Sequence, residues 1–226
     1  MKNLTLVIPA KNEEYSLPKV LNEIKYFKCK KIIVLGKSDF KTIKSLNNLD
    51  CKIIKQKNSG YGNAIIEGIN KTKTKYVCIF NADGSFHPKY LDLMLKKVFL
   101  GFNFVFGSRY LNKEGGSEDD TLLTLIGNKI FTFLGKLFFK LKLSDILFTY
   151  ILGETKKFKD LKLKSKDFRL CVEIPVKIVK KNYSYVTIPS FERSRLGGKK
   201  KVNEFKDGFL ILFAMIKFFI NFHKKN

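Results

Sequence analysis

The sequence predicts an α/β protein in which helices flank a mostly parallel sheet. Strand and helix patterns alternate along the first half of the chain, and the strands are nearly continuous apolar runs. This alternation indicates parallel strands joined by helical crossovers and covered on both faces. The 226 residues, 45% of them hydrophobic, are enough for a single domain with a substantial core.

Five strands are expected, each an apolar run closed by a polar residue, glycine or proline. They cover residues 4–9, 31–36, 51–56, 76–81 and 102–110. Helices are expected between them, where apolar residues recur three or four positions apart. They cover residues 17–27, 38–49, 61–71 and 87–98, and in the last of these His87-Pro88 begins the helix.

The carboxyl ends of these strands carry residues that suit turns and ligands. These residues are Pro9, Gly36, Asn81, Asp83, Ser108 and Arg109. Ligands of parallel α/β sheets bind beyond the carboxyl ends of the strands. Asp83 therefore stands where a ligand is expected to bind, although an aspartate before a glycine is also typical of a plain turn.

The chain is strongly basic. Its 44 Lys and Arg residues against 20 Asp and Glu give a formal net charge of +24. Such a charge indicates an anionic partner: nucleic acid, an acidic membrane surface or a phosphorylated small molecule. Nucleic acid is not expected, because the sequence carries no RNP, helix-turn-helix or zinc-finger signature. Part of the charge also has a simpler interpretation as solvated surface lysine.

The four cysteines are scattered and reduced in this interpretation. Cys29, Cys51, Cys78 and Cys171 show no paired spacing, so a zinc site is not expected. The first residues turn polar after a short apolar run, unlike a signal peptide. We therefore expect a cytoplasmic location.

Two segments of the second half are unusually apolar. Residues 121–142 form a long helix candidate in which Lys129, Lys136 and Lys140 share one face. Residues 208–222 are apolar nearly all round and precede His223-Lys224-Lys225. As a helix this last segment spans roughly 21 Å, short of the about 30 Å of a bilayer core. The segments are therefore either core helices or helices lying in an anionic membrane interface.

The carboxylate at Asp83 suits the chemistry of nucleotide sugars. A diphosphate leaving group carries negative charge that a hard divalent cation neutralises, and such a cation prefers oxygen ligands. We expect Asp83 to be the main ligand, with the amide oxygen of Asn81 and the hydroxyl of Ser85 beside it.

The chain from residue 4 to residue 208 resembles family 2 glycosyltransferases, and among them the dolichol-phosphate mannose synthases and their polyprenyl-phosphate relatives. Six motifs carry the resemblance in order and spacing. They are VIPAKNEE (7–14), NSGYGNAIIEG (58–68), NADGSFHP (81–88), GSRY (107–110) with Gly115-Gly116, Ser144-Asp145, and RLGGKKKV (195–202).

The resemblance implies a GT-A fold, a GDP- or UDP-linked sugar donor, Mg²⁺ or Mn²⁺, a polyprenyl phosphate acceptor and inversion at the sugar carbon. The residues matched to the donor site are Pro9, Ala10, Asn12, Glu13, Asn58, Gly60, Asn81, Ala82, Asp83, Arg195 and Lys201. Arg109, Arg195 and Lys201 are expected to bind phosphates, with a solvated basic loop as the alternative for the last two. With Asp83 and Arg109, Asp145 completes the expected catalytic set, as the base that a hydroxyl acceptor needs or else as a cap.

The sequence departs from the family pattern in two places. Gly36-Lys37 stand where the family has the aspartates of Asp-Asp-Gly-Ser, with Asp39 nearby, and the Gly-Phe-Arg that usually follows Ser144-Asp145 is absent. The nucleotide base and part of the phosphate site therefore stay open.

These observations lead to one functional expectation and two alternatives. We expect residues 1–118 to bind the nucleotide sugar and residues 119–226 to bind the acceptor, within one domain that associates peripherally with an anionic membrane. A hexose would pass to a polyprenyl phosphate. The alternatives are transfer to a glycan hydroxyl and a non-catalytic relative that binds nucleotide sugar or membrane. A homo-oligomer is compatible with the apolar segments.

Overall fold

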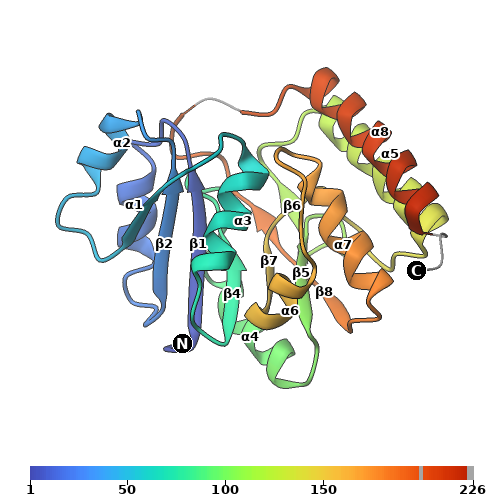
Figure 1. The fold of residues 1–226 in the computed structure, drawn as a ribbon, viewed down its shortest axis with the longest axis horizontal. Coiled ribbons are helices and arrows are strands. Elements are labelled where there is room, and N and C mark those ends of the chain that lie inside the picture. The colour runs from blue at the N-terminus through green and yellow to red at the C-terminus, as the bar shows by residue number, and fades with distance from the viewer. Residues whose placement is uncertain (199–200, 223–226) are drawn as a thin grey trace.

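A seven-stranded sheet forms the centre of the molecule in a computed structural model that describes residues 1–198 and 201–222 (Figure 1). Its order is β3-β2-β1-β4-β7-β5-β8. The strands are β1 (Leu4–Ala10), β2 (Lys30–Leu35), β3 (Lys52–Lys55), β4 (Tyr76–Ile79), β5 (Phe104–Ser108), β7 (Ile151–Glu154) and β8 (Tyr185–Pro189). Only β7 runs antiparallel to its neighbours in this sheet. The expected mostly parallel sheet is confirmed.

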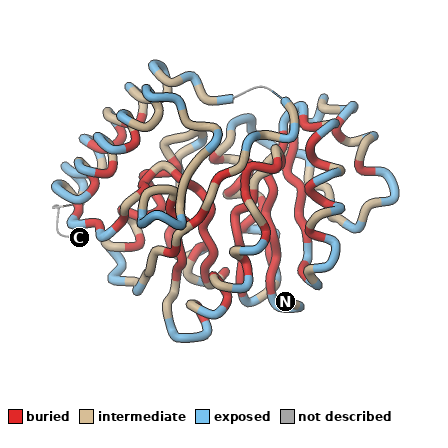
Figure 2. Tube along the Cα trace, turned by 180° about the vertical axis from the view of Figure 1, so that it is seen from behind, coloured by how far each residue is buried: buried red, intermediate tan, exposed pale blue. Residues whose placement is uncertain are grey.

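Helices cover both faces of the sheet. One core packs α1 (Leu17–Glu23), α2 (Phe40–Ser45) and α4 (Tyr90–Phe99) against one face, and a second packs α3 (Tyr61–Lys71), α6 (Thr155–Asp160) and α7 (Leu170–Lys180) against the other. The strands in the middle are buried along their length, whereas the outer surfaces of the helices are exposed (Figure 2). The helices therefore cover the two faces of the sheet and leave the ends of the strands uncovered.

The second half of the chain completes the sheet, which the sequence patterns did not show. β7 inserts between β4 and β5, and β8 forms the edge beside β5. A short second sheet pairs β6 (Gly116–Ser117) with β9 (Phe191–Glu192). Strands of both predicted halves therefore share one sheet. The predicted start of α4 was also wrong, because the helix begins at Tyr90, two residues after Pro88.

Two long helices lie side by side at one end of the molecule (Figure 1). They are α5 (Leu122–Phe139) and α8 (Glu204–Phe222), which pack on each other and on α7 through a third apolar cluster. Thr121 and Thr124 form a capping box at the start of α5, which stabilises that end of the helix. The predicted basic cap after α8, His223-Lys224-Lys225, lies outside the described residues.

One helix in the described part of the chain, α5, is long and apolar enough to cross a membrane by length and composition. Its mean hydropathy is 1.4 and 22% of it is buried in the molecule. Core helices of soluble proteins have the same length and composition, so these two properties alone do not make α5 a membrane-spanning helix. At about 1.5 Å per residue, its 18 residues span roughly 27 Å.

A pair of helical glycines tests the packing of α3 on the sheet. A Cβ on Gly68 would lie 2.3 Å from Cγ1 of Val7 and 3.1 Å from Cγ2 of Val34, whereas a Cβ on Gly127 of α5 would meet open space. We expect Gly68→Ala to destabilise the fold by about 1–3 kcal/mol through overpacking. Gly127→Ala is the matched control and should stabilise by up to about 1 kcal/mol. Urea unfolding followed by circular dichroism measures both, and equal midpoints would contradict this packing.

Candidate active site

The chain turns sharply at the carboxyl end of β4 and brings three oxygen-bearing side chains together. Oδ1 of Asp83 accepts a hydrogen bond from the backbone N–H of Ser85 at 3.0 Å, and Nδ2 of Asn81 donates to Oγ of Ser85 at 3.2 Å. Gly84 has φ +85°, and a Cβ there would lie 2.5 Å from the side chain of Leu196. The turn therefore needs glycine both for its backbone angle and for the close approach of Leu196.

A loop from the other end of the chain lies across this turn. The backbone N–H of Leu196 donates to the carbonyl oxygen of Asp83 at 2.8 Å, and Nη1 of Arg195 lies 3.4 Å from Oδ2 of the same residue. Nη2 of Arg195 also pairs with Asp119 at 2.8 Å. Further along, Nζ of Lys201 lies 3.4 Å from Oε1 of Glu13. Arg195 and Lys201 thus meet the predicted donor residues, while Lys199 and Lys200 lie outside the described residues.

Side-chain hydrogen bonds stabilise the turn after β1. Glu13 is nearly buried, and its Oε2 accepts a hydrogen bond from Ser16 at 2.6 Å. Burial raises the pKa of the Glu13 carboxyl, with Ser16 and Lys201 opposing that shift. The backbone N–H of Asn12, which has φ 54°, donates to Asp39 at 2.7 Å. Since Asp39 also caps α2 through Thr42, this carboxylate holds the loop.

The other predicted donor residues line the same edge. Pro9 and Ala10 end β1 beside the last residues of β2, and Ala82 is buried after β4. Gly60, with φ +116°, precedes α3, and a Cβ there would lie 2.2 Å from the carbonyl oxygen of Lys166. The side chain of Gln56 bridges the carbonyl oxygens of Asn58 and Gly60 at 3.0 and 2.9 Å. The topology therefore brings these residues together at the carboxyl ends of the strands. Their role in binding the donor stays a prediction.

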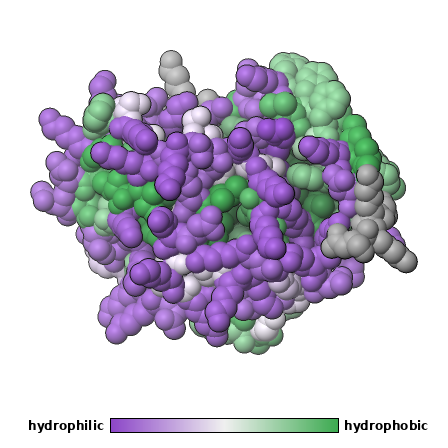
Figure 3. Space-filling view, viewed as in Figure 1, coloured by the Kyte–Doolittle hydropathy of each residue, from purple (hydrophilic) through white to green (hydrophobic). Residues whose placement is uncertain are grey.

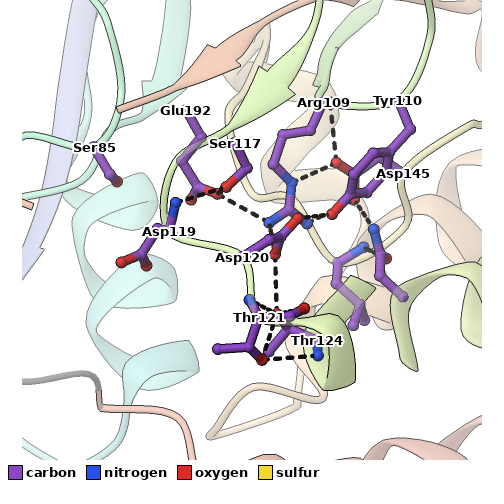
Figure 4. Close-up of polar contacts among 12 residues, drawn as sticks. Ser85, Arg109, Tyr110, Ser117, Asp119, Asp120, Thr121, Thr124, Asp145 and Glu192 are labelled. Carbon is purple, nitrogen blue, oxygen red and sulfur yellow. Dashed lines mark hydrogen bonds and ion pairs between the residues drawn. The ribbon is translucent and has the colours of Figure 1, made fainter. Parts of the chain in front are cut away.

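Arg109 occupies the carboxyl end of β5 at the centre of a charged network (Figure 4). Its Nε and Nη2 donate to the two carboxylate oxygens of Asp145 at 2.8 and 3.0 Å. Its Nη1 donates to Glu192 at 3.0 Å and to Asp120 at 3.3 Å. Tyr110 donates from its hydroxyl to Asp120. One guanidinium is thus shared by three carboxylates, so a phosphate reaches Nη1 only by replacing Glu192 or Asp120.

Asp145 lies behind Arg109 rather than in an open site. Its side chain is fully buried, and its oxygens also accept hydrogen bonds from the backbone N–H of Arg109 at 3.1 Å and from Nδ2 of Asn128 at 2.6 Å. A general base must reach the proton that it removes. In this arrangement Asp145 orients Arg109, so its predicted role as a base would need the network to rearrange.

Three carboxylates that pair with Arg109 or Arg195 were missed by the sequence analysis. Asp119 and Asp120 belong to the acidic run Glu118-Asp119-Asp120, which is a recognisable signal in so basic a chain. Glu192 sits in β9, and Ser117 donates to it at 2.6 Å. Burial raises the pKa of the Glu192 carboxyl although Arg109 lowers it. Within residues 1–198 and 201–222, no cluster of three or more His, Cys, Asp or Glu side chains has the geometry of a metal centre.

The fold and the position of this edge define a GT-A glycosyltransferase architecture. The structure is similar to that of glucosyl-3-phosphoglycerate synthase from Mycobacterium tuberculosis solved with Mn²⁺, UDP and glucosyl-3-phosphoglycerate, with a TM-score of 0.74 and 12% identity over 96% of this chain and 80% of that one. A structure of the same synthase with Mg²⁺ and UDP matches with a TM-score of 0.72 and 11% identity, over 96% and 79% of the two chains.

The chain belongs to glycosyl transferase family 2, whose model matches residues 5–162. Glycosyltransferase AglJ of Haloferax volcanii is 23% identical over 94% of this chain and 70% of its own length. An uncharacterised protein of Methanocaldococcus jannaschii, MJ1222, is 30% identical over 54% of this chain and 53% of its own length. The family prediction is confirmed, and the finer resemblance to dolichol-phosphate mannose synthases stays a prediction.

Proposed function

We propose that this protein transfers a hexose from a GDP- or UDP-linked sugar to a polyprenyl phosphate at a membrane surface, with inversion at the sugar carbon. Membership of glycosyl transferase family 2 supports the sugar transfer. The observation that carries the lipid acceptor is an exposed apolar surface on α5 and α8, joined directly to the Arg109 network.

The turn after β4 fits a divalent cation in its donor chemistry. Asp83, Asn81 and Ser85 offer carboxylate, amide and hydroxyl oxygens, the hard ligands that Mg²⁺ and Mn²⁺ take. A single carboxylate neutralises only half of the charge of a divalent cation and leaves the other half for the donor diphosphate. When bound, the cation would neutralise charge that develops on the leaving diphosphate. The structurally similar glucosyl-3-phosphoglycerate synthase was crystallised with UDP and either Mn²⁺ or Mg²⁺, which supports the same donor class here.

The basic loop beside Asp83 supports a contact with the donor phosphates. Arg195 and Lys201 hold Asp83, Asp119 and Glu13 in the present structure. An incoming diphosphate and cation offer the same pairing partners, so these ion pairs would exchange rather than be lost. Gly197 and Gly198, with φ +80° at Gly198, give the loop the backbone freedom for that exchange.

The acceptor side begins at Arg109. A phosphate monoester is anionic near neutral pH, so its oxygen attacks the sugar carbon without a general base. Nη1 of Arg109 points toward Glu192 and Asp120 at the end of β5, where an acceptor phosphate would take the place of one of these carboxylates. Asp145 and Asn128 then keep the guanidinium oriented from behind.

The apolar surface begins where that network ends. We define the α5–α8 apolar surface by its exposed residues Leu122, Leu123, Ile126, Ile130, Phe133 and Leu137 of α5 and Phe205, Phe209, Phe213, Ile216, Phe219 and Ile220 of α8. Their helical spacing places them on one side of each helix, and Lys129 and Lys136 border the α5 row. Apolar side chains gather along these helices in Figure 3. Such a surface, rimmed by lysine, suits the interface of an anionic membrane.

Transfer to a glycan hydroxyl remains the second candidate, and the acidic network favours it. A hydroxyl acceptor needs a carboxylate to take its proton. Asp119, which pairs with Arg195 beside the network, is the most open of these carboxylates, with its side chain 24% exposed, whereas those of Asp120 and Glu192 are 14% and 10% exposed. Asp119 therefore replaces the buried Asp145 as the base to test in that reaction.

One assay separates these functions. Purified protein is incubated with a panel of GDP- and UDP-sugars, Mg²⁺ or Mn²⁺, and either polyprenyl phosphate in anionic vesicles or soluble oligosaccharides, and the products are identified by mass spectrometry. We expect a glycosylated polyprenyl phosphate. A glycosylated oligosaccharide alone would establish the second candidate. Binding of a nucleotide sugar without transfer to either acceptor would indicate a non-catalytic relative.

Substitutions in the basic loop test its contact with phosphate. We expect Arg195→Ala and Lys201→Ala each to weaken binding of the nucleotide diphosphate by about 1.5–3 kcal/mol, roughly 10- to 150-fold, because each removes a charge-assisted hydrogen bond. Calorimetric titration with Mn²⁺ present measures this affinity. Lys181→Ala is the control, since Lys181 pairs with Asp160 away from this loop. Unchanged affinities in both loop variants would reduce the loop to a solvated basic segment.

A further inference from the structure

Helix α5 carries two polar side chains on its buried face. Asn128 is 2% exposed and Thr132 is 7% exposed, in a row with Gly135 and Phe139. Asparagine is a poor helix former, and a buried amide costs free energy unless its hydrogen bonds are made. An asparagine at this position therefore calls for a specific partner.

The hydrogen-bond partner of Asn128 is the carboxylate of Asp145, which pairs with Arg109. Nδ2 of Asn128 donates to Oδ1 of Asp145 at 2.6 Å, and its Oδ1 accepts from the backbone N–H of Leu147 at 3.4 Å. Oδ1 of Asp145 also accepts from Nη2 of Arg109, and Oδ2 accepts from Nε. The amide therefore fixes the plane of the carboxylate, and the carboxylate fixes the plane of the guanidinium.

Two aromatic rings and a second carboxylate also contact the guanidinium of Arg109. Its central carbon lies 4.8 Å from the ring centre of Phe148 and 5.1 Å from that of Tyr110. At the start of α5, Thr124 donates to Asp120 at 3.1 Å, and Asp120 accepts from Nη1 of Arg109. One helix thus reaches Arg109 through Asp120 on one side and through Asp145 on the other (Figure 4).

Thr132 provides a contrast one turn further along α5. Its hydroxyl accepts from the backbone N–H of Ile146 at 3.2 Å, next to Asp145 in sequence. It shares the burial and the helix face of Asn128, but this hydrogen bond is to the backbone rather than to the Asp145 carboxylate. Removing its hydroxyl therefore tests the general cost of a lost buried hydrogen bond on α5.

We propose that Asn128 is a positioning residue, which aims Nη1 of Arg109 at the acceptor phosphate by fixing the Asp145 carboxylate. The acceptor in this statement rests on the proposed function. The same helix carries the apolar surface, so the element that would meet the lipid also sets the direction of the group that would bind the phosphate.

The kinetic test compares Asn128→Leu, which keeps the number and branching of the non-hydrogen side-chain atoms, with Thr132→Val. Sugar transfer is measured with the polyprenyl phosphate concentration varied, and donor affinity is measured separately by titration. We expect Asn128→Leu to raise the acceptor KM at least tenfold while donor affinity and melting temperature stay close to those of Thr132→Val. Equal acceptor KM values in the two variants would overturn the proposal, and so would a loss of donor affinity in Asn128→Leu as large as its rise in acceptor KM.

A second measurement needs no substrate and separates this proposal from the proposed function. The Nε–H signal of Arg109 in the nitrogen-15 NMR spectrum, assigned with Arg109→Lys, should exchange slowly with water in the wild type and in Thr132→Val, and at least tenfold faster in Asn128→Leu. Unchanged exchange would overturn the positioning role, whatever the acceptor proves to be. If Asn128→Leu does not fold, Asn128→Ala removes the amide without added bulk and is tested in the same way.

Discussion

Replacing Asp83 with asparagine is expected to lower sugar transfer by about 10²–10³-fold, because a metal-held diphosphate depends on several kcal/mol of charge stabilisation. Asp83 is the carboxylate of the turn after β4, and its Oδ2 faces Arg195 at 3.4 Å. Its Oδ1 accepts from the backbone of Ser85, a contact that the asparagine side-chain oxygen can keep. The fold should therefore survive the change, with loss confined to metal and donor binding. Binding of Mn²⁺ and nucleotide sugar is measured by calorimetry beside the transfer rate.

Two variants make this result specific. Asp50→Asn removes a carboxylate that is 96% exposed and pairs with Lys31, so transfer should be unchanged. Asn81→Asp adds a carboxylate to the turn and should leave metal binding as tight or tighter. A large loss in Asn81→Asp would mean that the amide of Asn81 makes a contact that a carboxylate cannot replace. Wild-type affinity for metal and donor in Asp83→Asn would show that Asp83 only shapes the turn.

The sequence predicted best those features that local patterns decide. Helix α3 begins and ends where its apolar spacing predicts, at Tyr61 and Lys71, because one face packs on the sheet along its whole length. The five strands of the first half were found for the same reason. β7 was missed because its place in the middle of the sheet depends on pairing with two strands distant in sequence, β4 and β5.

The candidate site shows the same division. Asp83 was singled out because a carboxylate follows a buried strand, and the topology places it at the carboxyl ends of the parallel strands. Glu192 was missed because it lies 83 positions from Arg109, in a two-residue strand without a pattern of its own. Asp145 was singled out by its motif, yet the motif carried no information about its burial beneath Arg109. Ion pairs between distant loops depend on the tertiary fold, which spacing along the chain does not reveal.

The apolar helices illustrate a further limit. The spacing predicted a row of three lysines on one helix face. Lys129 and Lys136 are exposed on α5, but the prediction was wrong for Lys140, because the helix ends at Phe139 and Lys140 follows it with φ 55°. Spacing left open which apolar residues the rest of the protein would cover. The structure leaves Phe133 and Leu137 more than half exposed, whereas Phe139 is buried. The interpretation of α5 and α8 as core helices alone is therefore incomplete, because each has one covered side and one open side.

Replacing two phenylalanines of the α5–α8 apolar surface is expected to abolish most binding to membranes. Phe209 and Phe213 of α8 are 61% and 66% exposed. Burial of each phenylalanine in a membrane interface would stabilise the bound state by about 1.5–3 kcal/mol. A glutamate in the same place would not contribute this free energy of burial, and its charge would be repelled by anionic lipid. Phe209→Glu combined with Phe213→Glu should lower the partition coefficient by at least about 100-fold. Sedimentation with vesicles containing phosphatidylserine measures this coefficient.

The matched control moves the same change to another part of the surface. Phe40 and Phe99 are 70% and 68% exposed, and they lie on α2 and α4 rather than on the paired helices. Phe40→Glu combined with Phe99→Glu adds the same charge, so membrane binding should fall only slightly. High salt should loosen the wild-type protein in part, because it screens Lys129 and Lys136 and leaves apolar burial intact. If wild-type protein stays in the supernatant at low salt, and the α8 variant alone changes a self-association constant, the surface joins two copies of this chain. The lipid acceptor would then lose the observation that carries it, while the family and the donor site would stand.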